Sequence, residues 1–441
     1  MAAQLALYGE KPIVLIERTF VQRGCGVAFG TRHPRHMLNV RAAGMSAFPD
    51  KPDHFSNWLA TRRDATAHDF VERGLYGDYL SDVLEQARYR ADGGLISITG
   101  EAIAIERGAD GLVVHLADKR TVTAYQVVLA QGNLPPAQPA WLDSRLLPPG
   151  CYIDDPWADD LADHLPSEGT VVVLGSGLTA VDAALRLDAG GFQGRILCLS
   201  RRGLKPHRHL SGAIPLHGQR TTPAPVLSRL VGELRERATM IGWHAAVDEL
   251  RPVTQALWAR MPTHTRSRFL RHLRRYWDIH RHRLAPVAAD RFDGMIAEGR
   301  VQIAAGRVLG AEQSGSTARL TWDARDDGSR HVEDAIAIIN CTGPQTDIRR
   351  TRAPLLDDLL ARSLIRPDPL ALGIDVDQCC RVINAHGEAQ DDLFCIGPMS
   401  RGTFWEIIAI PDIRWQCQEL ARRLAEEKPA TRDVSNFALS R

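Results

Sequence analysis

The stretch Val171-Val-Val-Leu-Gly175-Ser-Gly177-Leu-Thr-Ala180 decides the fold of this chain. Its four apolar residues predict a buried strand, and the apolar periodicity of residues 181–187 predicts a helix directly after it. Gly175 permits a tight turn, Gly177 lets backbone approach a ligand, and Ala180 allows the helix to pack closely on the strand. The free N–H groups at such a helix start bind phosphate. The combination predicts a dinucleotide site formed by Gly175, Ser176, Gly177, Leu178 and Thr179; the alternative is an ordinary glycine-rich turn.

The next strand predicts which dinucleotide binds. Residues 195–199 form an apolar run that ends in Ser200, Arg201 and Arg202. An NAD site carries an acidic residue at this strand end, where it holds the 2′-hydroxyl of the ribose. A hydroxyl and two guanidinium groups suit a 2′-phosphate instead, so the sequence favours NADP. A solvated basic turn is the other interpretation of these residues.

Apolar runs rich in Val and Ile alternate with helical stretches along the chain. This pattern is typical of an α/β fold whose parallel strands are buried on both faces. The runs that predict strands are residues 12–17, 125–130, 170–174, 195–199 and 335–340. Shorter runs at residues 96–98, 112–116 and 121–123, joined by turns with Gly and Asp, predict an antiparallel segment. The Pro-rich residues 134–150 predict a linker, and residues 204–299 predict a long helical insertion.

The N-terminal strand repeats part of the nucleotide-binding pattern. Residues 13–16 end in Glu17, a carboxylate placed to hold an adenosine ribose, and the loop after it contains Gly24, Gly26 and Gly30. The glycine turn that should precede this strand is missing, because the spacing of the second unit places it before Met1. We therefore expect either an upstream start or the loss of the first strand and its pyrophosphate loop.

Composition excludes several classes of protein. With 54 Lys and Arg against 53 Asp and Glu, the net charge of +1 gives no general attraction to nucleic acid or to an anionic membrane. No apolar run reaches the roughly 18 residues of a membrane span. The eight scattered cysteines include no Cys-x-x-Cys pair, which argues against a thiol–disulfide reductase and a structural zinc site and indicates a reduced, cytoplasmic protein. Because His280 and His282 do not share a helix face, we expect no metal.

Further motifs are spread over nearly the whole chain. They include Gly24-Cys-Gly-Val-Ala-Phe-Gly30, His36-Met-Leu-Asn39, Leu75-Tyr76-Gly77, Ala130-Gln-Gly132-Asn133, Tyr276-Trp277-Asp278, Asn340-Cys-Thr342-Gly343-Pro344, Phe394-Cys-Ile-Gly397-Pro398 and Arg401-Gly402-Thr403-Phe404-Trp405-Glu406. Together they resemble the FAD/NAD(P)-binding protein family, two-dinucleotide-binding flavoproteins related to the flavin-containing and N-hydroxylating monooxygenases. The sequence departs from that family at its start, where the first strand and its Gly-x-Gly-x-x-Gly turn are missing.

The resemblance implies two Rossmann-like dinucleotide-binding domains. A FAD-type domain, residues 1–145 and 346–441, would be interrupted by an NADP-type domain, residues 146–345, with the helical insertion at about 204–300. The residues that would contact FAD or lie at the crossings between domains are Glu17, Arg23, Gly24, Gly26, Asn39, Gly132, Gly343, Gly397, Pro398 and Ile410. The helix near Ile410 would point its N-terminus at the flavin ring and stabilise negative charge there.

These features predict a flavin-dependent NAD(P)H oxidoreductase with FAD and NADP as cofactors. NADPH would pass hydride to the flavin, which would then react with O₂ as in a monooxygenase. Because the cofactor supplies this chemistry, no catalytic residue is identified. Two alternatives stay open: an NADPH oxidase or reductase that oxygenates nothing, and a non-catalytic nucleotide-binding protein with a degraded FAD site. The expected partner is a small-molecule substrate, with no nucleic acid and no membrane.

The missing first strand carries an expectation of its own. A parallel sheet without a central strand leaves backbone groups unpaired and exposes apolar side chains such as Ile13, Val14 and Leu15. We therefore expect the 441-residue chain alone to aggregate or to bind FAD weakly. A longer form that supplies the strand and its glycine loop should be soluble and take up flavin.

Overall fold

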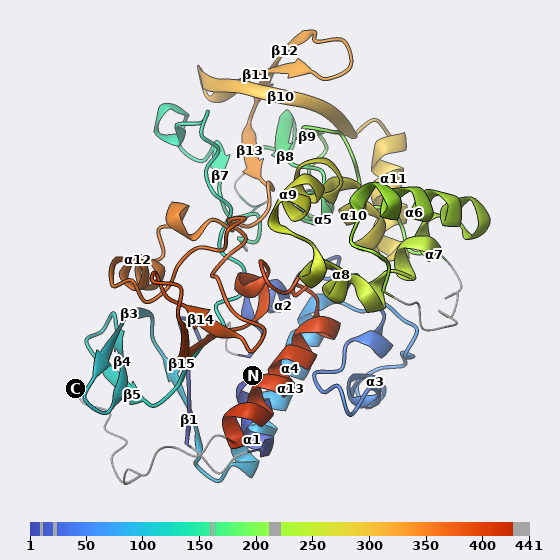
Figure 1. Ribbon diagram of the computed structural model, residues 1–441. Helices are drawn as coiled ribbons and strands as arrows, with labels where there is room; N and C mark the ends of the chain where they lie inside the picture. Colours follow the sequence, from blue (N-terminus) through green and yellow to red (C-terminus); the bar gives the residue numbers. More distant parts are fainter. Residues whose placement is uncertain are drawn as a thin grey trace.

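The computed structural model describes residues 1–8, 12–20, 24–158, 161, 163, 165–210 and 222–426. Figure 1 shows two α/β units. The outer unit contains the strands within residues 13–129 and 381–395, from the first and last parts of the chain, and the middle unit contains the strands within residues 152–340. A group of helices lies beside them. Parallel strands alternate with helices in both units, which confirms the predicted α/β class.

The elements have the following bounds. The helices are α1 (Ala2–Tyr8), α2 (Gly26–Gly30), α3 (His54–Ala60), α4 (Arg73–Arg90), α5 (Leu178–Ala189), α6 (Leu227–Ile241), α7 (Trp243–Asp248), α8 (Thr254–Arg260), α9 (Thr263–His272), α10 (Arg274–Arg281), α11 (Pro286–Ala297), α12 (Pro354–Ala361) and α13 (Ile410–Glu426). The strands are β1 (Ile13–Glu17), β2 (Leu95–Thr99), β3 (Ala102–Gly108), β4 (Gly111–Leu116), β5 (Thr121–Ala124), β6 (Val127–Leu129), β7 (Tyr152–Ile153), β8 (Thr170–Leu174), β9 (Arg195–Ser200), β10 (Val301–Ser314), β11 (Thr317–Ala324), β12 (Arg330–Ala335), β13 (Ala337–Asn340), β14 (Arg381–Ile383) and β15 (Ala389–Cys395).

A seven-stranded sheet forms the centre of the middle unit, in the order β12-β11-β10-β9-β8-β13-β7. Strand β8 lies between β9 and β13 and is parallel to both. It suits this place because Val171, Val172 and Val173 are apolar and fully buried, as a strand covered on both faces requires. Helices α5 and α11 pack together on one of those faces. The turn after β8 therefore lies at the carboxyl edge of parallel strands, where ligands bind in such sheets.

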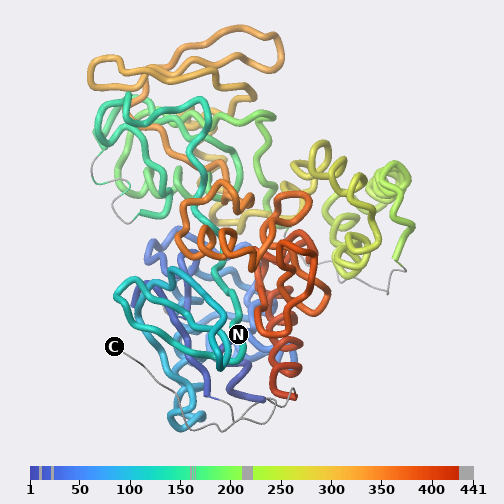
Figure 2. The backbone as a smooth tube through the Cα atoms, turned by 60° about the vertical axis from the view of Figure 1, so that its left-hand side comes forward, coloured from blue at the N-terminus to red at the C-terminus, as the bar shows by residue number. Residues whose placement is uncertain are grey.

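The outer unit combines the two ends of the chain. Strand β6 pairs in parallel with β15, which places residues 127–129 and 393–395 in one three-stranded sheet with β14. Helix α1 packs against α4 and α13. Figure 2 shows the red C-terminal segment running beside the blue N-terminal segment. Segments far apart in sequence thus build this unit jointly.

The structure corrects the prediction for residues 96–98. This run lies in β2, which pairs in parallel with β1 and does not join the antiparallel sheet β3-β4-β5. Alternating apolar residues report that one face is buried, but they say nothing about the direction of the partner strand. Sequence analysis also missed the antiparallel ladder of β10, β11 and β12, whose strands carry charged residues on their exposed face.

Two strands of the outer unit keep an open edge. Within the described part of the chain, β1 is bonded to β2 alone and β6 to β15 alone. All five residues of β1 are only half-buried, although four of them are large and apolar. The apolar side chains of β1 are therefore left partly exposed.

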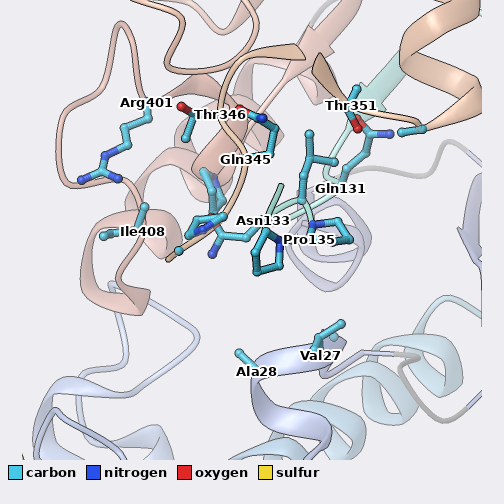
Figure 3. A pocket seen from close by; sticks show the side chains of 18 of the residues that line it. Val27, Ala28, Gln131, Asn133, Pro135, Gln345, Thr346, Thr351, Arg401 and Ile408 are labelled. Carbon is cyan, nitrogen blue, oxygen red and sulfur yellow. The ribbon is translucent and has the colours of Figure 1, made fainter. Parts of the chain in front are cut away.

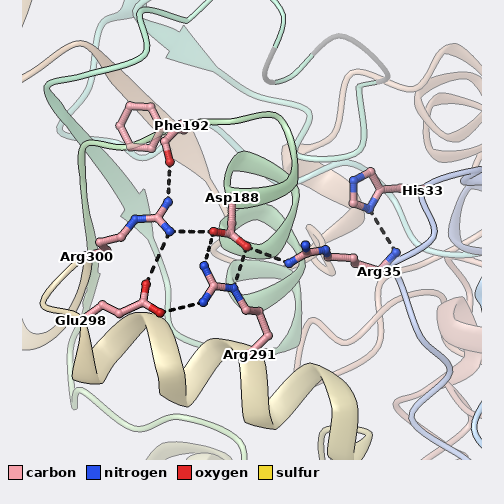
Figure 4. A network of polar contacts seen from close by, with 7 residues as sticks. All are labelled: His33, Arg35, Asp188, Phe192, Arg291, Glu298 and Arg300. Atoms are coloured by element: carbon pink, nitrogen blue, oxygen red, sulfur yellow. Dashed lines mark hydrogen bonds and ion pairs between the residues drawn. The ribbon is translucent and has the colours of Figure 1, made fainter.

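Ion pairs join the two units through α5 (Figure 4). Asp188 accepts hydrogen bonds from three arginines: Arg35 of the outer unit at 2.7 Å, Arg291 at 2.5 Å and Arg300 at 2.7 Å. Six residues earlier on the same helix, Asp182 pairs with Arg73 of α4 at 2.9 Å. Two buried carboxylates on one helix therefore hold the units against each other.

The helical group, α6 to α11, occupies the region where a helical insertion was predicted. Residues 211–221 of that insertion lie outside the described residues. The group packs on the C-terminal loop, because Trp258 of α8 stacks on Trp405 with ring centroids 4.6 Å apart. Among the residues that the structure describes, no helix is long and apolar enough to cross a membrane.

Candidate dinucleotide-binding cleft

A cleft of about 3890 Å³ lies between the two units and the helical group. Figure 3 looks into it, with Val27 and Ala28 of α2 on one side and Gln131, Asn133 and Pro135 across from them. Most of the predicted cofactor residues line this cleft: Glu17, Gly26, Asn39, Gly132, Gly175, Ser176, Gly177, Leu178, Thr179, Ser200, Arg201, Arg202, Gly343, Pro398 and Ile410. The fold thus brings residues from both ends and the middle of the sequence to one space.

Three predicted residues are placed differently. Gly24 packs on α4, where a Cβ at its position would lie 3.4 Å from Leu84, and it does not line the cleft. Gly397 does not line it either, because its N–H donates to Oε1 of Gln416 at 2.7 Å. Arg23 lies outside the described residues. A role in binding stays a prediction for the whole set.

The turn between β8 and α5 contains two glycines, and the space around their Cα atoms differs. Gly175 has a φ of +124°, and a Cβ there would lie 2.3 Å from the carbonyl oxygen of Cys341. Gly177 is the N-cap of α5, and no atom lies within 4 Å of the place where its Cβ would be. At Gly175 the neighbouring backbone leaves no room for a side chain. At Gly177 the space is open, which leaves room for a pyrophosphate at the helix start.

Serine hydroxyls tie this turn to the end of β9. Oγ of Ser176 lies 2.8 Å from Oγ of Ser200 and donates to the carbonyl oxygen of Leu204 at 2.6 Å. The N–H of Gly203 donates to Oγ of Ser200 at 3.0 Å. The Ser200 hydroxyl thus holds this loop in place. Arg201 and Arg202, which follow Ser200, are the charged side chains of the loop that line the cleft.

Arg201 and Arg202 form the core of a positively charged site. Nη1 of Arg202 donates to the hydroxyl of Tyr276 at 3.1 Å, and its guanidinium lies over that ring. Burial, together with Arg275, lowers the pKa of Arg201, and burial also lowers the pKa of Arg275. Guanidinium groups that lose solvent and repel one another are stabilised by an added anion, as a 2′-phosphate would be.

Sequence analysis missed the arginines that other elements bring to the same cleft. They are Arg271 of α9, Arg274 and Arg275 of α10, Arg307 of β10 and Arg325 after β11. The available signal in the sequence was the basic stretch of residues 266–283. Its position relative to Arg201 depends on how the helical group folds back, which local periodicity does not report.

The ribose-binding role predicted for Glu17 agrees with its position at the end of β1. Its Oε1 accepts a hydrogen bond from the N–H of Arg18 at 2.9 Å, and burial raises its pKa. Across the cleft, Oε1 of Gln131 is buried and has no hydrogen-bond partner among the described residues. Both side chains offer acceptor oxygens that ribose or ribityl hydroxyls could satisfy.

A buried charged cluster lies at the loop before α13, and its members Arg281 and His282 line the cleft. Glu406 is 3% exposed, has a φ of +72°, accepts a hydrogen bond from Nε1 of Trp277 at 2.8 Å and pairs with Arg281 at 3.0 Å. Burial opposes its ionisation, but His282, Arg281 and the Trp277 bond outweigh it and lower the pKa of Glu406. A strained backbone at a non-glycine residue often marks a functional site. Sequence analysis quoted this segment as a family motif but assigned it no role.

Comparisons with known proteins agree with this architecture. Residues 3–134 match the model of a family described as FAD-NAD(P)-binding. No curated protein sequence matches the chain. The ornithine N-hydroxylase of Kutzneria sp. 744, solved with reduced FAD, NADP⁺ and L-ornithine, is 17% identical, with 96% of this chain and 95% of that chain covered and a TM-score of 0.64.

Two further solved structures are similar over their whole length. The L-lysine 6-monooxygenase of Pseudomonas syringae is 16% identical, with 97% of each chain covered and a TM-score of 0.65. The cadaverine monooxygenase of Erwinia amylovora, solved with FAD, is 12% identical, with 100% of this chain and 95% of that chain covered and a TM-score of 0.64. The chain therefore has the fold of the N-hydroxylating flavin monooxygenases, and its residues 3–134 match the FAD-NAD(P)-binding family.

Proposed function

We propose that the protein is an NADPH-dependent, FAD-containing oxidoreductase that acts as a monooxygenase on a small-molecule substrate. The observation that carries this proposal is the one cleft onto which the β8–α5 turn, the end of β1 and the start of α13 all open. A coenzyme bound at the β8–α5 turn and a flavin bound along the end of β1 and the start of α13 would meet in that cleft. The fold shared with ornithine, lysine and cadaverine monooxygenases supports the same class of reaction.

The residues present fit NADPH. The open space at Gly177 and the free N–H groups of α5 would take the pyrophosphate. Arg201 and Arg202 would pair with the 2′-phosphate, and Tyr276 holds Arg202 in place for that contact. Ser176 and Ser200 keep the two loops at a fixed separation.

The fit to FAD differs between its parts. Glu17 suits the adenosine ribose, and the N-terminus of α13 at Ile410 suits the oxygen-rich edge of the flavin ring. The pyrophosphate has no strand-to-helix glycine turn of the β8–α5 kind in the described part of the outer unit. Gly26 and its neighbours on α2 are the available backbone there. We propose that flavin binding depends on filling the open edges of β1 and β6.

The chain's own residues set the conditions of the reaction. When bound, the flavin supplies hydride acceptance from NADPH and reaction of its reduced form with O₂. Residues of α10 and of the C-terminal loop line the same cleft as Ile410. Glu406 is held ionised by Arg281 and Trp277, so its negative charge stays fixed in that wall.

The test is to purify the chain and measure bound flavin, NADPH oxidation and oxygen products. We expect flavin absorption bands after incubation with FAD, faster oxidation of NADPH than of NADH, and hydrogen peroxide when no substrate is present. L-ornithine, L-lysine and cadaverine serve as probes, and a productive substrate should lower the peroxide formed per NADPH. Peroxide yield unchanged by every substrate class would favour an NADPH oxidase.

A second candidate is a non-catalytic nucleotide-binding protein, which the open edges of β1 and β6 favour. A colourless chain that takes up no FAD but binds NADPH would support it. We also propose the division into a FAD-type domain of residues 1–145 and 346–441 and an NADP-type domain of residues 146–345. The cytoplasm suits the eight cysteines, none of which forms a disulfide bond in the described part of the chain.

A further inference from the structure

Arg401 is a buried cation that forms no ion pair with any described residue. It is 5% exposed, and its Nε is buried with no hydrogen-bond partner among the described residues. No carboxylate of the described residues lies within ion-pair distance of the Arg401 guanidinium. Burial and the nearby Arg274 lower its pKa to about 10, so it still carries its charge at neutral pH. An unpaired buried charge is costly to a folded protein, and an anionic ligand would remove that cost.

The acids near Arg401 have other partners. Glu406 is bound by Arg281 and Trp277, and His282 lies 3.8 Å from its Oε1. Asp278 lies 3.6 Å from Arg274. Both carboxylates favour the charge of Arg401 from a distance, but neither forms an ion pair with it among the described residues.

The guanidinium of Arg401 is held in a fixed position. It lies over the ring of Trp405, with Cζ 4.4 Å from the ring centroid. Trp405 is 1% exposed and is stacked on Trp258 of the helical group. Arg401 lines the cleft, and Figure 3 shows it in the pocket wall near Thr346 and Ile408. A charged group that is fixed, desolvated and open to a cleft is preorganised for binding.

We propose that Arg401, with Arg274 and Arg275 of α10 beside it, forms an anion subsite that holds a carboxylate of the substrate. The subsite lies on the loop that leads into α13, whereas Arg202 and Tyr276 mark the 2′-phosphate end of the coenzyme. The assignment to a substrate rests on the proposed function. The oxyanion chemistry itself does not, and a phosphate group of a dinucleotide is the other source of the same chemistry.

The experiment titrates the full chain with sodium succinate at constant ionic strength and follows tryptophan fluorescence, because Trp405 lies directly under Arg401. Inorganic phosphate, ADP and NADPH are the comparison probes, and the midpoint of thermal unfolding is recorded with and without each anion. We expect saturable succinate binding that raises the unfolding midpoint, as any ligand of the native state does. Phosphate and ADP should neither match nor displace it.

The variants separate Arg401 from the coenzyme site. R401Q and R401M should weaken succinate at least tenfold and leave the NADPH dissociation constant unchanged, and R401K should keep part of the succinate binding. R202Q is the matched control, with NADPH weakened and succinate unaffected. Because the Arg401 charge has no ion-pair partner among the residues that the structure describes, R401M should unfold at the same temperature as the wild type or a higher one.

Several outcomes would overturn the proposal. They are no succinate binding, equal binding by R401Q, or a clearly lower unfolding midpoint of R401M, which would make Arg401 a structural residue. Displacement of succinate by ADP, together with weaker NADPH binding by R401Q, would assign the subsite to a dinucleotide phosphate. Succinate binding by a chain that takes up neither FAD nor NADPH would leave the anion subsite standing and remove the proposed function.

Discussion

Gly175 and Gly177 stand two residues apart in one turn, yet substitution by alanine should affect them through different mechanisms. In Gly175→Ala the new methyl group would meet the Cys341 carbonyl in a backbone conformation that disfavours side chains, so we expect a loss of stability of at least about 2 kcal/mol. In Gly177→Ala the methyl group meets open space, so stability should hold while NADPH binding weakens. Denaturant unfolding and NADPH titration of both variants test this. Equal losses of stability would contradict the assignment.

The choice of coenzyme should reside in Arg201 and Arg202. Each charge-assisted hydrogen bond to the 2′-phosphate contributes about 1.5–3 kcal/mol, so R201Q/R202Q should lose at least a hundredfold in NADPH affinity. NADH affinity should change little. R319Q, which removes an exposed arginine of β11 that pairs with Asp334 of β12, is the control. Equal affinity of the unmodified chain for the two coenzymes would remove the basis of the assignment.

Sequence predicted the residues whose roles are local and missed those whose roles are not. Gly175 and Arg201 were found because a strand, a turn and a helix follow one another within a short stretch. Arg275 and Arg401 reach the same cleft only through the packing of the helical group on the C-terminal loop. No periodicity within a segment reports that packing, since it depends on contacts such as Trp258 on Trp405.

Among the elements, β1 and β6 are two strands that each have one edge without a bonded neighbour in the described part of the chain. Both line the cleft, and each has one open edge within the described residues. We expect that an apolar strand followed by a glycine turn, fused ahead of Met1, will pair with β1 and increase both soluble yield and FAD bound per chain. The control is a fusion of equal length whose apolar residues are replaced by Ser. A soluble 441-residue chain with one tightly held FAD would show that the open edges do not limit flavin binding.

Element prediction succeeded where burial on both faces imposes a simple pattern. Strand β8 was predicted from its continuous apolar run, which is typical of a fully buried parallel strand, and helix α5 was predicted from its apolar periodicity. The ladder β10 to β12 was missed, in part because β12, with the sequence Arg-His-Val-Glu-Asp-Ala, is mostly charged and exposed and contains no apolar run. Strand β2 was found, but its partner was not, since β1 lies far from it in the sequence.

At the scale of the whole molecule, the carboxylates of α5 should differ in what they contribute to stability. Hydrogen bonds from Arg291 and Arg300 hold the pKa of Asp188 far below its usual range, whereas burial raises the pKa of Asp182 despite its pair with Arg73. We therefore expect Asp188→Asn to cost about 3 kcal/mol at pH 7 and Asp182→Asn clearly less. Chemical denaturation of both variants measures the difference, and a larger loss in Asp182→Asn would contradict it.

The Asp188 contribution should also depend on pH in a defined direction. A carboxyl group whose pKa is lower in the folded state stabilises the fold at pH values above its unfolded pKa of about 4, and this stabilisation is lost as the pH falls further. The difference in unfolding free energy between the wild type and Asp188→Asn should therefore stay constant from about pH 5 to about pH 8 and should shrink below about pH 4. A difference that grew on acidification would assign the effect to another group.

Helix α10 links the two ends of the cleft through adjacent residues. Tyr276 contacts Arg202, where the coenzyme is expected, and Trp277 donates to Glu406, whose loop carries Arg401. A ligand at either end that shifts this helix must change the energy of the other contact. Thermodynamic linkage then fixes the size of the response: the factor by which coenzyme tightens an anionic substrate equals the factor by which that substrate tightens the coenzyme. A mutual affinity of this kind would retain the oxidised coenzyme for as long as the substrate stays in place.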